Sequence, residues 1–507
     1  MGSRPGGKAV RSARLILWIV FTLFRSGILP FNLRHWFGML RAFWRCGPSF
    51  AFLGQLADVR FPGREALVDD EGSLTFGQLR VEADRLARYL RNEVGMEAGQ
   101  RVAIVFANHR GFVLSLLALT RIGADVLPVN PKLPRGPMSD ILNSQRIDLV
   151  LHEAEVTEHI DPSRAAVVWQ EGLDGRGPLP RVKRAGQLIV LTSGSTGVSK
   201  GIVRRPTLGE ILPVTAGLLR DLPIALHRRT ILAIPFYHGY GIATLAMSLP
   251  LGCSLSTGRK YDVSTLLARQ TTPDPALLVT VPTLLWRWIQ HSKDHPSLSA
   301  VITGSAPLSA HLCRSLTDRL GPILYNLYGA TETGLIALAT PAMLSTSPGC
   351  VGKPLPGNQV EIEGQIGAIR VRGPLVLGAG TDGWLNTGDL GRFDGNGYLH
   401  VCGRADGMIV SGGENVYPHE LEDVLAEHPH LKEFSVLPVE DEEFGQRLIA
   451  AVVSTGELRE ADLKDWLAAR LERFKLPRRI YFLDSLPRNE LGKVRQKDLM
   501  TMIGEQG

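Results

Sequence analysis

The stretch LTSGSTGVSKG, residues 191–201, is dense in Gly, Ser and Thr and directly follows the apolar run QLIVL, residues 187–191. This order predicts a buried strand that runs into a polar loop. Glycines let the backbone turn tightly and approach a ligand closely, and successive N–H groups in such a loop form an anion-binding concavity. The loop therefore predicts a polyphosphate site, because an ordinary Gly/Ser linker has no reason to follow a buried strand.

The candidate phosphate-binding residues of this loop carry hydroxyl groups, a positive charge or no side chain at all. They are Thr192, Ser193, Gly194, Ser195, Thr196, Gly197 and Lys200. The Walker pattern requires Gly-Lys-Ser/Thr, whereas Lys200 is preceded by Ser199 and followed by Gly201. The loop is therefore a phosphate site of another kind.

Composition and charge limit the alternatives. A chain of 507 residues is too long for one core, so at least two domains are expected. Its five cysteines have no paired spacing, which argues against zinc and disulfides and favours a reducing cytoplasm. Residues 1–60 carry a net charge of +8 and the remainder −2, so nucleic-acid binding by the body of the chain is not expected.

Five further segments carry polar or glycine-rich patterns beside apolar runs. They are VITGSAPLS (301–309), NLYGATETG (326–334), GWLNTGDLG (383–391), GRADGMIVSGGENVYP (403–418) and LPRNELGKVR (486–495). With the loop at 191–201, they resemble the motifs of the adenylate-forming superfamily, which includes acyl-CoA synthetases, beetle luciferases and peptide-synthetase adenylation domains. The Tyr-Gly-x-Thr-Glu motif is matched in full at residues 328–332.

The resemblance extends over residues 60–500 and is greatest to fatty acyl-CoA ligases. It implies an α/β fold with a large N-terminal domain of packed mixed sheets and helices and a small, mobile α+β C-terminal domain. We therefore expect three regions: 1–60 as a basic apolar segment, 61–405 as the ATP- and acyl-binding domain, and 406–507 as the mobile domain. The strand–helix–strand rhythm from residue 101 onward independently predicts a parallel sheet covered on both faces.

For the nucleoside, the resemblance implies three contacts. The backbone of Gly304, Ser305 and Ala306 faces adenine, and Tyr328 stacks on the base. Asp389 holds the ribose, since one carboxylate accepts from two vicinal hydroxyls.

For the reaction, the resemblance implies catalytic roles for Thr331, Glu332 and Lys493. Thr331 donates to the α-phosphate, Glu332 holds Mg²⁺ through a hard oxygen ligand, and Arg404 contacts ribose or phosphate. His238 falls beside the substrate carboxylate, although a lone histidine is more often structural and both interpretations stay open at this point.

The second half-reaction requires a change of conformation and a thiol. By the same resemblance Asp406 is the hinge, and Gly412 and Gly413 leave room for the pantetheine arm of CoA. Two alternatives remain: an acyl-AMP ligase that loads a carrier protein, and an inactive membrane-bound acyl or nucleotide sensor. The short stretch at 347–384 has no additional insertion and favours CoA, while the presence of Lys493 and Glu332 argues against the sensor.

The substrate is expected to be a small-molecule carboxylate. The corner Phe236-Tyr237-His238 contains no acidic residue to anchor an amine, which disfavours an amino acid. The helix expected after it is small and apolar, which suits a fatty acyl chain.

Residues 1–60 could contact a membrane surface. The run at 15–24 is too short to span a bilayer, which takes about 20 residues. In residues 32–47 the large apolar side chains share one helical face, edged by Arg34, Arg41 and Arg45. An interfacial helix at the inner face of the membrane has this pattern, and so does a helix that completes the enzyme core. We expect a cytoplasmic protein in both cases.

Overall fold

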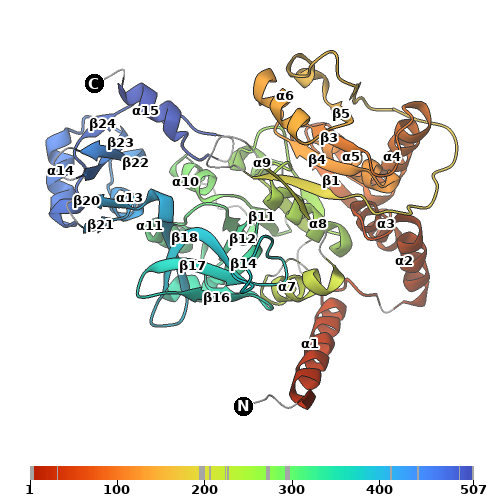
Figure 1. Cartoon of the computed structure of the whole chain (residues 1–507), viewed down its shortest axis with the longest axis horizontal. Coiled ribbons are helices and arrows are strands. Elements are labelled where there is room, and N and C mark those ends of the chain that lie inside the picture. The colour runs from red at the N-terminus through yellow and green to blue at the C-terminus, as the bar shows by residue number, and fades with distance from the viewer. Residues whose placement is uncertain are drawn as a thin grey trace. The chain divides into compact units, whose positions relative to one another are not determined.

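The computed structural model describes residues 5–30, 32–192, 200–204, 207–222, 224, 228–269, 274–291, 297–411, 414–441, 445–489 and 492–504. The chain forms two compact units (Figure 1). The first consists of residues 1–279 and 296–300, and the second of residues 280–295 and 301–507. This division does not test the predicted boundary at residue 405, which stays a prediction.

The first unit contains a six-stranded sheet of order β6-β5-β3-β4-β7-β8. Its strands are β3 (Arg101–Val105), β4 (Asp125–Val129), β5 (Leu149–His152), β6 (Ala166–Val168), β7 (Leu188–Thr192) and β8 (Lys200–Arg204). All neighbours are parallel except β7 and β8. Helices α5 (Arg110–Ile122) and α6 (Arg135–Ser144) form the crossovers, as the strand–helix–strand rhythm predicts.

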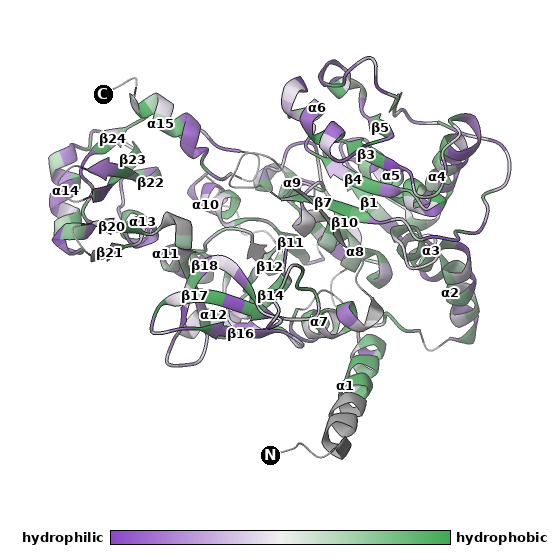
Figure 2. Ribbon diagram, in the orientation of Figure 1, coloured by the Kyte–Doolittle hydropathy of each residue, from purple (hydrophilic) through white to green (hydrophobic). Residues whose placement is uncertain are grey.

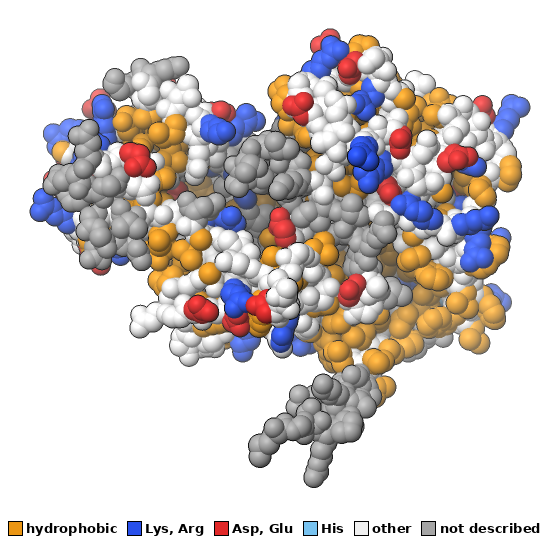
Figure 3. Space-filling model, viewed as in Figure 1, with side chains coloured by type: hydrophobic (Ala, Val, Ile, Leu, Met, Phe, Trp, Pro, Cys, Tyr) orange, Lys and Arg blue, Asp and Glu red, His pale blue; other side chains and the backbone are white. Residues whose placement is uncertain are grey.

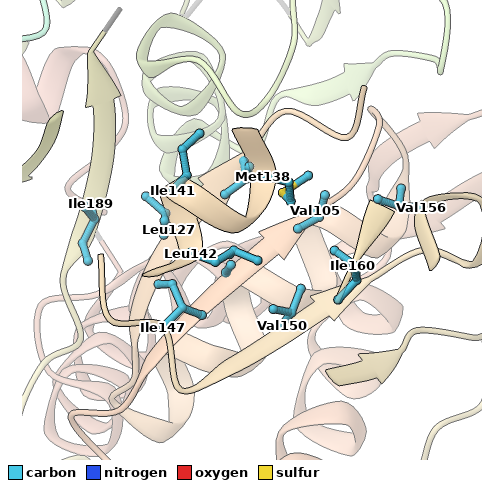
Figure 4. Close-up of a cluster of buried hydrophobic side chains, with 12 residues drawn as sticks. Val105, Leu127, Met138, Ile141, Leu142, Ile147, Val150, Val156, Ile160 and Ile189 are labelled. Carbon is cyan, nitrogen blue, oxygen red and sulfur yellow. The ribbon is translucent and has the colours of Figure 1, made fainter. Parts of the chain in front are cut away.

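The core beneath α6 follows from strand alternation. Val105 of β3, Leu127 of β4 and Val150 of β5 are all fully buried and pack with Met138 and Leu142 of α6 (Figure 4). Because successive strand residues face opposite sides of a sheet, the intervening residues point to the other face. The sheet is therefore apolar on both sides, as a covered parallel sheet requires.

A second group of strands in this unit has the order β11-β9-β10-β1-β2. These are β1 (Glu65–Asp69), β2 (Gly72–Thr75), β9 (Arg229–Leu232), β10 (Ser254–Ser256) and β11 (Ala276–Val279). The remaining α-helices described here are α1 (Pro5–Arg25), α2 (Leu33–Cys46), α3 (Phe50–Arg60), α4 (Phe76–Arg88), α7 (Leu208–Asp221), α8 (Gly239–Leu251) and α9 (Val263–Ala268). Figure 2 shows α8 as mostly hydrophobic, whereas α4 and α6 alternate between polar and apolar residues.

The second unit has three groups of strands. The first has the order β15-β14-β13-β12, the second β16-β17-β18-β19, and the third β21-β20-β23-β22 with β24 beside β23. Their bounds are β12 (Leu298–Gly304, in this unit from residue 301), β13 (Leu324–Ala330), β14 (Gly334–Ala339), β15 (Lys353–Pro354), β16 (Gln359–Ile362), β17 (Gly367–Arg372), β18 (Leu385–Phe393), β19 (Leu399–Arg404), β20 (Ile409–Ser411), β21 (Glu414–Val416), β22 (Leu431–Asp441), β23 (Gly445–Ser454) and β24 (Ile480–Phe482).

The α-helices of the second unit are α10 (Pro282–His291), α11 (Ala310–Leu320), α12 (Pro341–Thr346), α13 (Pro418–Leu425), α14 (Glu460–Ala468) and α15 (Gln496–Gly504). The last three follow residue 405. The strands β20–β24 and helices α13 and α14 enclose a core of their own around Leu421, Ala450 and Leu463. A compact α+β subdomain therefore occupies the C-terminal part of the chain.

Both helices expected in residues 1–60 are present, as α1 and α2. Among the residues described, no helix has the length and hydrophobicity needed to cross a bilayer.

Candidate nucleotide and acyl site

The predicted phosphate loop joins two antiparallel strands. Thr192 at the end of β7 is the backbone partner of Lys200 at the start of β8. Residues 193–199, which include Ser193, Gly194, Ser195, Thr196 and Gly197, lie outside the described residues. The strand that the sequence predicts before the loop is confirmed.

A buried asparagine fixes the corner that carries His238. Asn108, fully buried after β3, donates through Nδ2 to the carbonyl of Ile234 (2.7 Å) and the hydroxyl of Thr257 (2.9 Å). Its Oδ1 accepts from the backbone N–H of Phe236 (2.7 Å). One amide side chain therefore saturates the backbone on both sides of the turn after β9, which limits how far the turn can move.

His238 lies where this turn becomes a helix. It is the N-cap of α8, and its half-buried ring is 4.7 Å from the ring of Tyr237. The structure gives His238 a defined place at the start of α8, in the turn that follows the buried strand β9. Its role beside a substrate carboxylate stays a prediction.

The second unit brings three predicted nucleotide residues into direct contact. The hydroxyl of Tyr328, on β13, donates to Asp389 Oδ2 at 2.6 Å. The other carboxylate oxygen of Asp389 lies 3.3 Å from Arg404 Nη1. Asp389 on β18 and Arg404 on β19 are cross-strand partners. The carboxylate is therefore held from two sides by residues 61 and 15 positions away in sequence.

Thr387 supports this cluster and was not predicted. Its hydroxyl accepts from the backbone N–H of Asp389 (3.1 Å) and donates to the carbonyl of Ile369 (3.0 Å). Between them Gly388 has φ +76°, and a Cβ there would lie 2.9 Å from the Arg404 guanidinium. The glycine of the Thr-Gly-Asp motif thus serves both the turn and the approach of Arg404.

Burial raises the pKa of Tyr328, and the neighbouring charge of Asp389 raises it further. The phenol therefore stays protonated and remains a donor to the carboxylate at physiological pH. Its ring belongs to the partly buried side chains around the core of Ile336 and Val371.

Thr331 and Glu332 lie in the tight turn between β13 and β14, and both are half-buried. The fully buried Thr333 closes this turn, accepting from the N–H of Ala330 at 3.0 Å and donating to the carbonyl of Gly334 at 3.0 Å. Within the described residues no group of three or more His, Cys, Asp or Glu side chains forms a metal cluster. Glu332 supplies a single hard carboxylate, which suits a Mg²⁺ ion that keeps waters and binds substrate phosphates.

Lys493 is carried by a turn that its own neighbours close. Its backbone N–H donates to Asn489 Oδ1 (2.9 Å), and its carbonyl accepts from the N–H of Asn489 (2.8 Å). Arg488 donates to the carbonyl of Gly492 (2.6 Å) and pairs with Glu433 at 2.8 Å. Gly492 has φ +74°, and a Cβ there would collide with Thr283 of α10. A side chain at position 492 would therefore displace the turn.

Lys493 lies within electrostatic reach of the nucleotide cluster. Desolvation lowers the pKa of its ammonium group, Asp389 raises it, and Arg404 lowers it, so that the balance is a lowered pKa. Lys493, Asp389 and Arg404, which are predicted to act in catalysis or nucleotide binding, therefore interact electrostatically.

The remaining predicted residues lie at the ends of strands, in turns between strands or outside the described residues. Gly304 ends β12, and Ser305 adopts φ +65°, an uncommon left-handed conformation for serine. Asp406 lies in the 3₁₀ turn at 405–407 between β19 and β20, and its role as the hinge stays a prediction. Gly412 and Gly413 lie outside the described residues.

Comparison with known families gives two matches. Residues 55–378 match the model of the AMP-binding enzymes, and residues 420–493 match the model of the AMP-binding enzyme C-terminal domain.

Individual proteins similar to this chain include CoA ligases and related solved structures. The 2-succinylbenzoate–CoA ligase of Bacillus licheniformis is 29% identical over 466 residues, which cover 86% of this chain and 97% of that protein. The solved o-succinylbenzoate CoA synthetase of Bacillus subtilis, in complex with its acyl-adenylate intermediate, has a TM-score of 0.78 at 26% identity and covers 88% of this chain and 97% of its own. ATP-bound MatB of Rhodopseudomonas palustris has a TM-score of 0.76 at 27% identity, with 89% and 98% covered.

Proposed function

The chain belongs to the family of AMP-binding enzymes, and on this premise we propose that it activates an apolar monocarboxylic acid, a fatty acid, as its CoA thioester. As an AMP-forming acid–thiol ligase it uses ATP and Mg²⁺, with CoA as the second substrate. The resemblance of its motifs to the adenylate-forming superfamily is confirmed. The observation that carries the proposal is the Tyr328–Asp389–Arg404 cluster with Lys493 in its field.

In the first half-reaction a carboxylate oxygen of the acid attacks the α-phosphorus of ATP, and pyrophosphate leaves. The Asp389 carboxylate, already oriented by Tyr328 and Arg404, is placed to accept from the ribose hydroxyls. Lys493 supplies a positive charge for the oxygens that become more negative in the transition state. Mg²⁺ held by Glu332 would neutralise phosphate charge. These groups act by position and charge, without a covalent enzyme intermediate.

In the second half-reaction the CoA thiolate attacks the carbonyl carbon of the acyl-adenylate, and AMP leaves. We propose that the C-terminal subdomain turns about Asp406 between the two steps, withdrawing Lys493. The short 3₁₀ turn that contains Asp406, between two strands of different sheets, supports this role.

The preference for an apolar acid rests on α8, the helix that His238 caps. Its buried side includes Ile242, Leu245 and Leu249. The partly exposed positions 240, 243, 244, 246 and 247 carry Tyr, Ala, Thr, Ala and Met, none of them charged. Such a surface suits an alkyl chain and offers no cation to a second carboxylate.

2-Succinylbenzoate is the second candidate substrate, since the relatives above are named for it. This acid carries two carboxylates, so a site for it needs a hydrogen-bonding or cationic partner for the carboxylate that does not react. At 28–29% identity, a shared reaction does not require a shared acid. Carrier-protein loading and a silent sensor receive no support from these relatives.

The test is a pyrophosphate-release screen with Mg·ATP, with and without CoA, over octanoate, dodecanoate, hexadecanoate, benzoate and 2-succinylbenzoate. The Lys493→Ala variant serves as the blank. We expect the highest kcat/KM with one of the fatty acids and formation of its CoA thioester. A higher kcat/KM with 2-succinylbenzoate would replace the fatty acid by the second candidate. No pyrophosphate release with any of these acids would contradict the ligase reaction itself.

A further inference from the structure

Helix α2 packs on the enzyme through its smallest residues. Ala42 and Cys46 are buried, and a Cβ on Gly38 would lie 2.5 Å from Val59 of α3. These three positions follow the i, i+4, i+8 spacing of one helical face. A helix that completed a core would turn its large side chains inward, so the orientation of α2 is the reverse of that expectation.

The large apolar side chains of α1 and α2 face outward instead. Among the residues described, sixteen large hydrophobic side chains are exposed, and ten of them belong to these two helices: Leu15, Ile16, Leu17, Val20, Phe21, Leu33, Phe37, Leu40, Phe43 and Trp44. Phe37 is 72% exposed and Leu33 73%. Figure 3 shows hydrophobic side chains gathered on the first unit beside α1. Exposed apolar residues concentrated in this way indicate an interaction surface.

The charged residues of the segment that forms α1 and α2 have one sign. Residues 1–57 contain no acidic residue, and Asp58 is already paired with Arg80 at 2.7 Å. Arg25, at the end of α1, and Arg34 and Arg41, on α2, are exposed. Cations at the edge of an apolar face can place their charges at the level of lipid headgroups while their stems cover apolar surface.

A groove of about 750 Å³ opens beside α2 and is lined by both apolar and cationic side chains. Its apolar part includes Leu40, Phe43 and Trp44, and its cations are Arg41, Arg181 and Lys183. No acidic residue is among the described residues that line it. The Arg181 guanidinium lies over the Trp44 ring at 4.7 Å, which holds one cation against the aromatic wall.

From the outward apolar face and this cationic groove, we propose that α1 and α2 dock on an anionic lipid bilayer, with a lipid phosphate in the groove. Aromatic and aliphatic side chains enter the headgroup boundary, as in interfacial helices. The three groove cations meet the negative headgroup. A second copy of this chain would bring another cationic surface against this one, so charge favours the lipid.

The docking surface is joined to the helix proposed to face the acyl chain. Arg60 donates to the carbonyls of Gly27 and Ile28, between α1 and α2, and to that of Pro250 near the end of α8 (2.8 Å). A bilayer contact would therefore hold α8 near the membrane, where fatty acids partition. This goes beyond the proposed reaction, which requires no membrane.

The experiment is flotation of the full-length protein with vesicles of neutral phosphatidylcholine or of phosphatidylcholine with 30% phosphatidylglycerol. We expect binding to the anionic vesicles and little to the neutral ones. The double variant Arg181→Gln/Lys183→Gln should bind anionic vesicles about thirtyfold more weakly, since each cation near such a surface contributes about fivefold. Phe37→Ser/Leu40→Ser, at exposed positions, should weaken binding to both vesicles.

The matched control is Lys132→Gln/Arg135→Gln, which removes the same charge from exposed positions at α6. It should bind like the parent protein. The proposal is contradicted if the control loses as much binding as the groove variant, if neutral and anionic vesicles bind equally, or if Phe37→Ser/Leu40→Ser only dissociates a dimer. The thermal unfolding midpoint of each variant reports folding, and because neither this measurement nor flotation depends on catalysis, failure of the ligase proposal leaves the test intact.

Discussion

The nucleotide cluster of the second unit and the corner at His238 in the first unit are built in opposite ways. In the cluster, charged and hydroxyl side chains from three strands contact one another directly, around Asp389. At the corner, one buried amide, Asn108, binds backbone groups, and the helix beyond it offers small uncharged side chains. Under the proposed function, preformed polar contacts would recognise the nucleotide, and the shape of an apolar surface held in place by its backbone would recognise the acid.

The largest expected effect comes from removing the positive charge of Lys493. Lys493→Ala should lower acyl-adenylate formation by about 10²–10³-fold, the usual cost of losing one transition-state contact. Transfer from supplied acyl-adenylate to CoA should remain near the parent rate, since Lys493 is proposed to act only in the first step. Single-turnover assays of each half-reaction measure this. Lys497→Ala, at an exposed position of α15, is the matched control, and equal losses in both half-reactions would contradict the two-conformation scheme.

The sequence predicted the cluster residue by residue but not the contacts among them. Tyr328, Asp389 and Arg404 are each predicted from a local motif that resembles one of the adenylate-forming superfamily. The hydrogen bond from Tyr328 to Asp389 depends on how β13 and β18 come together, which is a long-range consequence of packing. Thr387 was missed for the same reason.

The corner on the acid side should depend on one asparagine. Asn108→Ala leaves the Phe236 N–H and the Ile234 carbonyl without their partner, at about 1–3 kcal/mol for each buried group. We expect a lower free energy of unfolding and a higher KM for the acid, with the KM for ATP unchanged. Asn108→Asp keeps the acceptor for the Phe236 N–H, so its stability and its KM for the acid should fall between those of the parent protein and of Asn108→Ala. An unchanged acid KM in a folded Asn108→Ala protein would remove the positioning role.

The sequence does not predict that Asn108 holds the turn before His238. A strand ending in asparagine is visible, but the partners lie 126 and 149 residues further along the chain. The face of α2 shows a related limit. Periodicity predicted which side chains share a face, yet whether that face points inward was decided by the small residues that pack on α3.

A smaller effect is expected on the nucleotide side from Tyr328→Phe. A hydrogen bond to a charged group such as the Asp389 carboxylate contributes about 1.5–3 kcal/mol. Its loss leaves the carboxylate less well oriented, and the contact with the ribose replaces part of this energy. We expect the KM for ATP to rise about tenfold, with the KM for the acid unchanged. Tyr398→Phe, at another half-buried tyrosine of this unit, is the control. A shift in acid KM instead would contradict the separation of the two regions.

The smallest effect is a change in pH dependence. Lys493 is charged below its pKa, and that pKa is lowered chiefly by desolvation. Adenylation should therefore begin to fall, as pH rises, below the ordinary lysine value of about 10.4. Asp389 raises this pKa, so Asp389→Asn should move the decline to lower pH. Pyrophosphate release measured from pH 6 to 10 tests this, and a rate that stays constant to pH 10 would contradict it.

The most direct measurement of the central claim follows one acyl group through both steps. The full-length enzyme is mixed with Mg·ATP and dodecanoate, CoA is added after the first turnover, and the products are resolved by mass spectrometry. We predict enzyme-bound dodecanoyl-adenylate with one equivalent of pyrophosphate before CoA, and dodecanoyl-CoA with AMP after it. Formation of ADP and phosphate, or an adenylate that CoA does not consume, would contradict the proposed ligase.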